Sequence, residues 1–337
     1  MPSHSPVSFF NCATLSVTRN IDKASQRRPP MPRPKTTTRK QTPPASQLLL
    51  FGQGKEREVA PFKQGLLKWI GSKQRMAHEI VAYFPKTFGR YFEPFVGSGA
   101  VLATLSPHDA LASDTFAPLI EIWHSLRDDP QTLIGWYSDR YERMQKGDKV
   151  TVYEEIKASY NSRPNGADFL FLCRSCYAGV VRFRKADGYM STPCGPHKPI
   201  PPASFTARVK EWNRRTKGTE FSLCDYRIAL EAAKAGDLVY CDPPYTHSQA
   251  ILYGAQSFRL EELLEAIAEC KQRGVHVALS IDGTKRSGET ICDLPIPKKL
   301  FSREILIDCG RSMLRRLQMS GQTLEGEVVS DRLLLTY

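Results

Sequence analysis

Apolar positions from about residue 62 onward alternate between a helical period and a strand period. The early part of this pattern predicts a helix over residues 74–84, a strand over 90–96, a helix through Leu105, a strand over 110–114 and a helix over 117–127. Such a β-α-β-α opening is typical of an α/β protein built around a mostly parallel sheet.

Residues 130–217 break this alternation. They carry helical periods at 131–145, 151–160, 166–176 and 204–215. The alternation then resumes with strands at 219–224, 238–241, 275–281 and near 302–308 and 327–336, and with a helix over 258–273 that we expect Ser257 to cap. We therefore predict one body formed by residues 63–129 and 218–337, with residues 130–217 as an insert.

The first part of the chain has no apolar face. Residues 1–63 hold eleven Lys and Arg against three Asp and Glu, within a chain of 337 residues and net charge +12, and they are rich in Pro, Ser and Thr. We predict a disordered basic tail over residues 1–62. Three interpretations of this tail remain. It binds nucleic acid loosely, or it is a solvated leader or the product of an upstream start codon, with Met31 as the true initiator, or it is an organellar transit peptide.

Several classes of protein are disfavoured by what the sequence lacks. It has neither a run of about 18 apolar residues nor a secretory signal, so we expect a cytoplasmic protein with no membrane partner. Most of the nine cysteines lie in apolar or motif-like contexts, which favours reduced thiols over a disulfide framework. No obligate protein partner is evident.

A second basic concentration lies in the insert. Residues 174–217 hold ten Lys and Arg against two acidic residues, Asp187 and Glu211. Aromatic residues are interleaved with them, namely Tyr177, Phe183, Tyr189, Phe205 and Trp212. This mixture suits a groove that follows phosphates and wedges bases apart. On composition alone, a solvated charged face is an equal alternative.

The segment EPFVGSG at residues 93–99 lies at a predicted strand-to-helix turn. Gly97 and Gly99 would let the backbone approach a ligand, and Asp114, at the end of the next strand, would accept both hydroxyls of a ribose. Phosphate cofactors prefer a third glycine and no carboxylate. Because the turn carries Glu93, it favours a cationic ligand such as the sulfonium of S-adenosylmethionine; a tight turn without ligand is the alternative.

The segment VYCDPPY at residues 239–245 ends a short apolar strand in a carboxylate, two prolines and a ring. An exocyclic amine on a base is a poor nucleophile because its lone pair is delocalised into the ring. Asp242 and the carbonyl of Pro243 would accept its two hydrogens and localise the lone pair, Pro244 would stiffen the turn, and Tyr245 would stack on the extruded base.

A third segment, KWIGSK at residues 68–73, precedes both motifs. In this order the three motifs resemble the Dam-type DNA adenine-N6 methyltransferases, from about residue 66 to Tyr337. The resemblance implies a Rossmann-like, S-adenosylmethionine-dependent sheet with an inserted, mainly helical target-recognition domain that contains a β-hairpin. It implies a catalytic body at 63–129 and 218–337 and DNA recognition at 130–217.

The resemblance also assigns residues. The cofactor contacts that it implies are Trp69, Gly71, Lys73, Glu93, Phe95, Gly97, Gly99, Asp114, Asp225 and Asp242. Lys73 is similar to a lysine that approaches the catalytic site, beside Asp242, Pro243, Pro244 and Tyr245. Asp225 is also consistent with an ordinary polar residue that leads into a helix.

Residues 177–184 (YAGVVRFR) resemble the family's recognition hairpin, which implies DNA contacts by Tyr177, Arg182 and Arg184. An arginine that reaches guanine and an aromatic wedge are what such a hairpin supplies. Ala178 and Arg184 replace asparagines that are frequent in the family. These departures put the GATC target of its best-known members in doubt.

A zinc site is a competing interpretation of the insert. Cys173 and Cys176 precede Cys194 and His197 at a spacing compatible with a structural metal. However, Cys173 lies in an apolar segment where a buried helical thiol is ordinary, and the recognition hairpin requires no metal. We predict none.

The function implied is transfer of a methyl group from S-adenosylmethionine to the N6 amine of adenine in double-stranded DNA, with base flipping. Methylation of cytosine N4 or of RNA is one alternative, because similar tetrapeptides serve other planar amines. A DNA-binding regulator of the same fold without turnover is another. Restriction-companion, replication and phage-borne roles all stay open.

Overall fold

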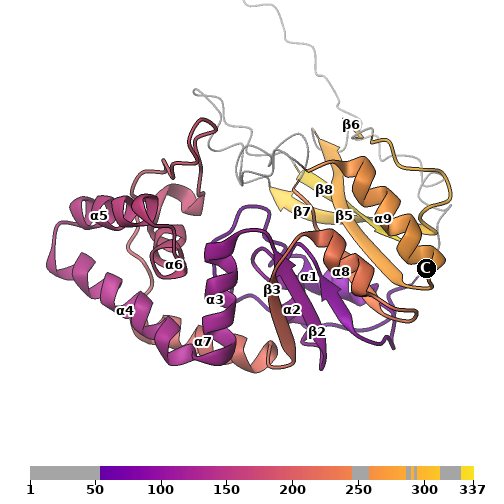
Figure 1. Ribbon diagram of the computed structural model, residues 1–337, viewed down its shortest axis with the longest axis horizontal. Coiled ribbons are helices and arrows are strands. Elements are labelled where there is room, and N and C mark those ends of the chain that lie inside the picture. Colours follow the sequence, from indigo (N-terminus) through magenta and orange to yellow (C-terminus); the bar gives the residue numbers. More distant parts are fainter. Residues whose placement is uncertain (1–53, 245–257, 286–289, 292–293, 312–327) are drawn as a thin grey trace, which may run out of the picture. The chain divides into compact units, whose positions relative to one another are not determined.

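Seven strands run side by side in the order β3-β2-β1-β4-β5-β8-β7 in the computed structural model, and β6 pairs with β5 off this path (Figure 1). The structure describes residues 54–244, 258–285, 290–291, 294–311 and 328–337, and all of them belong to one compact unit. The strands are β1 (Tyr91–Glu93), β2 (Ala110–Asp114), β3 (Thr219–Leu223), β4 (Leu238–Cys241), β5 (His276–Lys285), β6 (Thr290–Ile291), β7 (Arg303–Arg311) and β8 (Val328–Leu335).

The sheet is mostly parallel, as predicted. Strands β3, β2, β1, β4 and β5 are parallel to one another, whereas β8 lies antiparallel between β5 and β7. The chain moves outward in one direction through β1, β2 and β3 and in the other through β4 and β5. Strand order therefore reverses between β1 and β4, which is where ligands bind in open α/β sheets.

Helices cover both faces of this sheet and form the insert (Figure 1). They are α1 (Ala77–Ala82), α2 (Ala100–Leu105), α3 (Ala117–Asp128), α4 (Pro130–Lys146), α5 (Lys149–Ser162), α6 (Gly166–Ser175), the 3-10 turn η1 (Tyr177–Gly179), α7 (Pro202–Arg215), α8 (Tyr226–Ala232) and α9 (Leu260–Gln272). The N-cap of α9 is Arg259. The expected cap Ser257, which lies outside the described residues, is therefore too early in the chain.

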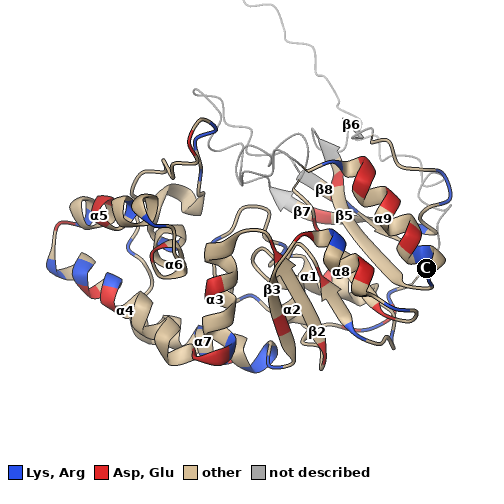
Figure 2. Cartoon of the chain, viewed as in Figure 1, with Lys and Arg blue, Asp and Glu red and all other residues tan. Residues whose placement is uncertain are grey.

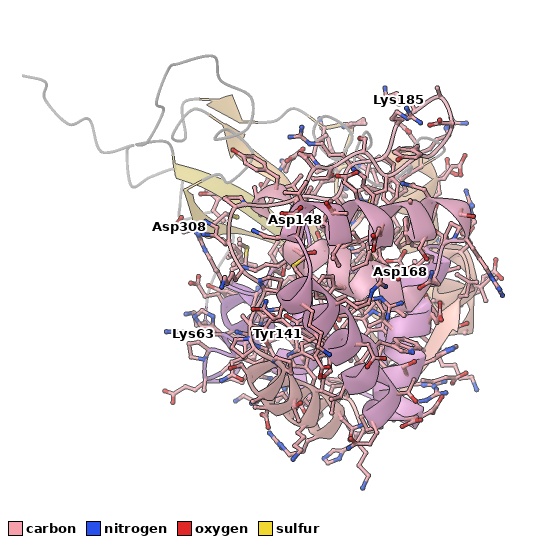
Figure 3. All side chains as sticks on the ribbon, turned by 90° about the vertical axis from the view of Figure 1, so that its left-hand side faces the viewer. Lys63, Tyr141, Asp148, Asp168, Lys185 and Asp308 are labelled. Atoms are coloured by element: carbon pink, nitrogen blue, oxygen red, sulfur yellow. The ribbon has the colours of Figure 1, made fainter. Side chains whose placement is uncertain are left out.

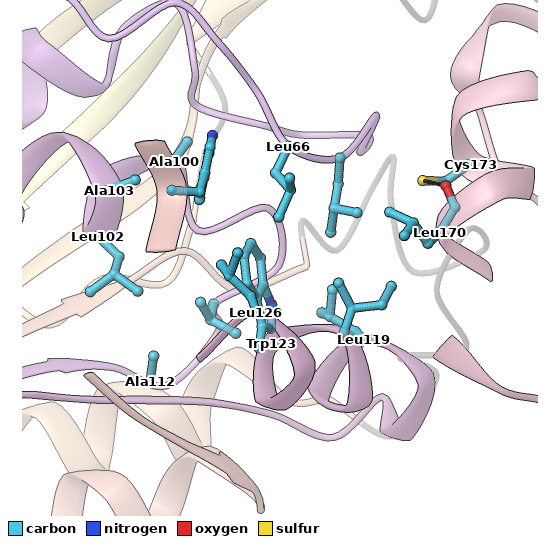
Figure 4. Packing of buried hydrophobic residues seen from close by; sticks show 14 of the residues in the cluster. Leu66, Ala100, Leu102, Ala103, Ala112, Leu119, Trp123, Leu126, Leu170 and Cys173 are labelled. Carbon is cyan, nitrogen blue, oxygen red and sulfur yellow. Dashed lines mark hydrogen bonds between the residues drawn. The ribbon is translucent and has the colours of Figure 1, made fainter. Parts of the chain in front are cut away.

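Strand alternation divides the apolar side chains into two cores. Tyr91 and Tyr240 point to the face covered by α1, α2 and α3, whereas Phe92, Val239 and Cys241 point to the face covered by α8 and α9. The first core continues from the sheet through Leu102 and Trp123 to Leu170 and Cys173 of the insert (Figure 4).

The insert packs directly on the sheet's helices. The ring of Trp212 in α7 stacks on that of Trp123 in α3, with centroids 5.6 Å apart. Inside the insert, the buried carboxylate of Asp168 accepts hydrogen bonds at 2.8 Å from Arg140 Nε of α4 and Ser159 Oγ of α5 (Figure 3). These contacts fix the insert's helices relative to one another.

Packing against the body begins before the boundary that the sequence places at residue 62. The backbone N–H of Glu56 donates to the carbonyl of Ala82 at 2.7 Å, and Phe62 is buried with its ring 5.5 Å from that of Trp212.

No helix in the described ranges is long and apolar enough to span a membrane.

Candidate active site

Three acidic residues meet at the carboxyl-terminal edge of the sheet. Glu93 ends β1, Asp114 ends β2 and Asp242 follows β4 directly. The register pairs Glu93 with Ala112 and Phe92 with Val239, so the three strands end close together. The reversal of strand order thus places acidic side chains from distant sequence segments at one edge.

A cavity of about 460 Å³ opens at this edge. Predicted site residues that line it are Trp69, Gly71, Lys73, Glu93, Phe95, Gly97, Asp114, Asp225, Asp242 and Pro244. Gly99 and Pro243 are not in its wall, and Tyr245 lies outside the described residues. The structure therefore gathers most of the predicted catalytic and cofactor residues around one space.

The glycine turn is held against its neighbours by close backbone contacts. The Gly97 N–H donates to Asp114 Oδ2 at 3.2 Å, and Gly97 has a left-handed φ of 43°. A Cβ atom on Gly97 would lie 2.9 Å from Trp69 Nε1. Gly99 lies against the aromatic core, because a Cβ there would meet the rings of Trp123 and Trp212 at 3.3 Å.

Lys73 connects three parts of the site. Its Nζ lies 2.7 Å from Asp242 Oδ1 and 3.6 Å from Asp331 Oδ2 of β8, and it donates to the carbonyl of Gly71 at 3.2 Å. Burial alone would lower the pKa of Lys73, but the two carboxylates outweigh it and raise the pKa above its ordinary value. Lys73 is therefore a fixed cation beside Asp242.

Glu93, at the end of β1, is a buried carboxyl group that makes no salt bridge within the described residues. It is 3% exposed and accepts a hydrogen bond at 2.6 Å from Tyr91 Oη. Burial, aided by the negative charge of Asp242, raises its pKa to about 8 despite the hydrogen bonds from Tyr91 and the Leu102 N–H. A cation bound beside Glu93 would favour its ionised form and lower this pKa, so this part of the cavity lining suits a positively charged ligand.

Asp225 and Tyr226 also line the cavity. Asp225 caps α8 by accepting from the Arg227 N–H at 3.0 Å, so it leads into the helix and also lines the cavity. The Tyr226 ring stacks on Phe95 with centroids 5.2 Å apart. The buried Oη of Tyr226 has no hydrogen-bond partner among the described residues.

Aromatic residues make a further wall that the motifs do not identify. Phe116 contacts the rings of both Trp69 and Phe183, with centroids 6.4 Å and 5.8 Å away. Phe183 comes from the insert and also lines the cavity. In the sequence Phe183 stands between Arg182 and Arg184. This alternation of an apolar with two basic residues is the signal that the Phe183 side chain faces away from the two arginine side chains.

The predicted DNA contacts lie outside the cavity. Tyr177 is 48% exposed, and Arg182 and Arg184 are exposed on the loop that follows η1. Ala178 in η1 has a left-handed φ of 56°, a conformation that Asn or Gly adopts more readily. The hairpin expected here is irregular, with two isolated bridges, Cys176 with Cys194 and Phe183 with Met190, rather than two strands.

The cysteines of the insert form local contacts. Cys173 Sγ donates to the carbonyl of Leu170, and Cys176 Sγ contacts that of Cys173. Burial raises the pKa of Cys173 to about 11. In the part of the chain that the structure describes, no three or more His, Cys, Asp or Glu side chains are grouped to hold a metal ion.

Comparison with known proteins matches residues 69–306 to the family of D12 class N6 adenine-specific DNA methyltransferases. A DNA N-6-adenine-methyltransferase of Escherichia phage P1 is 29% identical over 71% of this chain, which spans 33% of that longer protein. A DNA adenine methylase of Vibrio cholerae is 26% identical over 65% of this chain and 81% of its own length. A type II methyltransferase of Lactococcus lactis is 24% identical over 68% and 85%.

A solved structure, the rRNA methyltransferase aviRa of Streptomyces viridochromogenes, aligns with 87% of this chain and 93% of its own at 12% identity and a TM-score of 0.34, too low to bear on fold or substrate. The family match covers more than half of the chain and confirms the resemblance carried by the three motifs. This chain belongs to the D12 class N6 adenine-specific DNA methyltransferase family.

Proposed function

We propose that this DNA adenine-N6 methyltransferase holds S-adenosylmethionine in the cavity and methylates an adenine rotated out of double-stranded DNA. One observation carries the proposal: Asp242 and Pro244 of the amine-binding turn line the same cavity as Glu93 and Gly97 of the cofactor turn. The donor and the acceptor amine can therefore meet in one space.

The residues of the cavity fit the cofactor. The absence of a Cβ at Gly97 lets the Trp69 indole lie directly against the glycine turn, and Asp114, at the end of β2, suits the ribose hydroxyls. The unpartnered Tyr226 Oη supports a ligand in the cavity beside Asp225 and Phe95. Glu93 suits the cation. When bound, S-adenosylmethionine supplies an electrophilic methyl group on its sulfonium.

Asp242 is the acceptor that would hold the target amine. Lys73 keeps a fixed positive charge 2.7 Å from Asp242 Oδ1, which favours the ionised carboxylate. An ionised carboxylate accepts hydrogen bonds only, so it can take one amine hydrogen while the Pro243 carbonyl takes the other. Tyr245 is proposed to stack on the base. Cys241 is buried on the opposite face and has no role as a nucleophile here.

The depth of the site supports base flipping. The side chain of Asp242 is 19% exposed and that of Lys73 is 5% exposed. An amine inside a stacked duplex cannot reach a recessed carboxylate, and enzymes that modify bases solve this by extruding the nucleotide. The basic insert, residues 130–217 with Tyr177, Arg182 and Arg184, is proposed to hold the duplex around the extruded adenine.

Transfer of a labelled methyl group tests the proposal. We expect the chain to label duplex DNA and to leave RNA of the same sequence unlabelled. Asp242→Asn should lower the rate about 10²- to 10⁴-fold, whereas Asp109→Asn, at an exposed carboxylate before β2, should not. If the intact chain bound DNA but transferred no methyl group, the alternative of a DNA-binding regulator would be favoured. Preferential labelling of RNA would mean that the substrate is RNA and not double-stranded DNA.

A further inference from the structure

Arg184 is held in place by two other residues of its own loop. Its Nε donates to Asp187 Oδ1 at 3.1 Å and its Nη2 donates to Asp187 Oδ2 at 2.7 Å. The centre of its guanidinium lies 4.2 Å from the ring centroid of Tyr189, which is the distance of a stacked cation–π contact. The side chain is nevertheless 52% exposed, so it is fixed in one orientation while still facing solvent.

The contact with Asp187 uses only one edge of the guanidinium. That edge is formed by Nε and Nη2, whereas the end-on edge is formed by Nη1 and Nη2. Within the described ranges, no residue accepts a hydrogen bond from Arg184 Nη1. The end-on edge matches the O6 and N7 acceptors of guanine in the major groove, which is the commonest specific contact between a protein and DNA.

An oriented guanidinium can also pair with a phosphate, because Arg–phosphate pairs are frequently bidentate. Only a contact with a base edge carries sequence information, so the two contacts differ in their effect on the recognition sequence. Lys185, the next residue along the chain, is the contrast within the loop: it is exposed at the outer margin of the loop, and no salt bridge within the described residues holds it (Figure 3). The backbone N–H of Tyr189 and the Arg184 side chain lower the pKa of Asp187, so its carboxylate stays charged at neutral pH.

The loop places Arg184 next to the cavity but on its outer side. Backbone hydrogen bonds of 2.9 Å join Arg184 N to Tyr189 O and Ser191 N to Arg182 O, so side chains alternate between two faces. Phe183 faces the cavity wall and pairs with the buried Met190. Arg182 and Arg184 therefore lie on the opposite face, and this loop carries both basic and acidic residues (Figure 2).

We propose that Arg184 reads a guanine in the major groove within the recognition sequence, with Asp187 and Tyr189 as positioning residues that orient its end-on edge. The proposal rests on the proposed function, because it assumes that the cavity takes a base from the same duplex. It makes Arg184 a specificity-determining residue, and the guanine lies close to the target adenine because Phe183 belongs to the cavity wall.

The recognition sequence, mapped in a host free of DNA methylation, tests this assignment. Plasmid libraries with randomised sites would carry the intact chain, Arg184→Ala, Asp187→Asn or Lys185→Ala, and long-read sequencing would report the methylated sites. For Arg184→Ala we expect preference for guanine at one position to fall about 10- to 100-fold while adenine remains the methylated base. Asp187→Asn should lower the same preference by less, and Lys185→Ala should leave the sequence unchanged.

A second measurement separates this proposal from the proposed function. Randomised duplexes selected by binding to the intact chain and to Arg184→Ala report guanine preference without any turnover. If the intact chain transferred no methyl group but Arg184→Ala still lost a selected guanine, the proposed function would fail and the assignment would stand. If both chains selected the same duplexes, or Arg184→Ala only weakened all sites equally, Arg184 would be a phosphate contact and the assignment would be wrong.

Discussion

Replacement of Glu93 by Gln is expected to stabilise the protein without its cofactor, and to do so most at alkaline pH. Burial raises the pKa of Glu93 from 4.5 to about 8. Because the folded value is the higher one, the favourable contribution of Glu93 is complete below about pH 4.5 and is lost as the pH rises toward 8. Above pH 8 the fold must hold an ionised carboxylate that is 3% exposed.

The magnitude follows from this interval. One pH unit corresponds to about 1.4 kcal/mol, so the rise from 4.5 to about 8 amounts to about 5 kcal/mol of lost stability. Gln has one acceptor oxygen for the two donors, Tyr91 Oη and the Leu102 N–H, and a lost buried hydrogen bond costs about 1–3 kcal/mol. The net gain for Glu93→Gln should therefore be about 2–4 kcal/mol at pH 9. At pH 5 the same change should be neutral or slightly destabilising.

Urea unfolding of the intact chain and of Glu93→Gln at pH 5, 7 and 9 measures this difference. Glu231→Gln, on the exposed side of α8, is the matched control and should show the same small difference at each pH. The reasoning would be refuted by a Glu93→Gln difference that did not change between pH 5 and pH 9, because Glu93 would then not titrate in that range.

Three further substitutions test other parts of the site. Lys73→Met leaves Asp242 and Asp331 without their shared cation and should cost about 3–5 kcal/mol in unfolding free energy at pH 7. Since the Lys73 pKa is raised, this cost should shrink only above the ordinary lysine pKa of 10.5. Equal stability of the variant and the intact chain at pH 7 would contradict the claim that Lys73 holds the two carboxylates. Gly97→Ala places a Cβ 2.9 Å from Trp69 Nε1 and should weaken S-adenosylmethionine binding by calorimetry at least about tenfold, which corresponds to about 1.4 kcal/mol; unchanged affinity would remove Gly97 from the cofactor site. Ala178→Gly relieves a left-handed φ of 56° and should raise stability by about 1 kcal/mol in thermal unfolding, whereas a loss would mean that the turn is not strained.

Buried parallel strands were the easiest elements to predict from the sequence. The bounds of β2 and β4 agree with the prediction residue for residue, because each is a short run of apolar or small residues that ends in or before an aspartate. The ends of a strand were less predictable where tertiary contacts determine them. The first strand stops at Glu93, three residues early, because Pro94 begins the turn, and β5 continues to Lys285 because β8 and β6 pair with its end.

The motifs located the cavity because each carries its chemistry in a few consecutive residues. Asp331 was missed, since only the pairing of β8 with β5 brings it within 3.6 Å of Lys73. A signal was present: Asp331 and Arg332 are the two charged residues of a terminal strand that is apolar apart from them and Ser330. The contact of Arg184 with Asp187 and Tyr189 was also unpredictable, because it depends on how one irregular loop folds.

The most direct test of the central claim is identification of the modified nucleoside in duplex DNA that the purified chain has treated with S-adenosylmethionine. The account predicts N6-methyladenine from the intact chain and its near absence from Asp242→Asn, with S-adenosylmethionine still bound. N4-methylcytosine as the product, or full N6-methyladenine formation by Asp242→Asn, would contradict the claim that Asp242 holds the amine of adenine opposite the methyl donor.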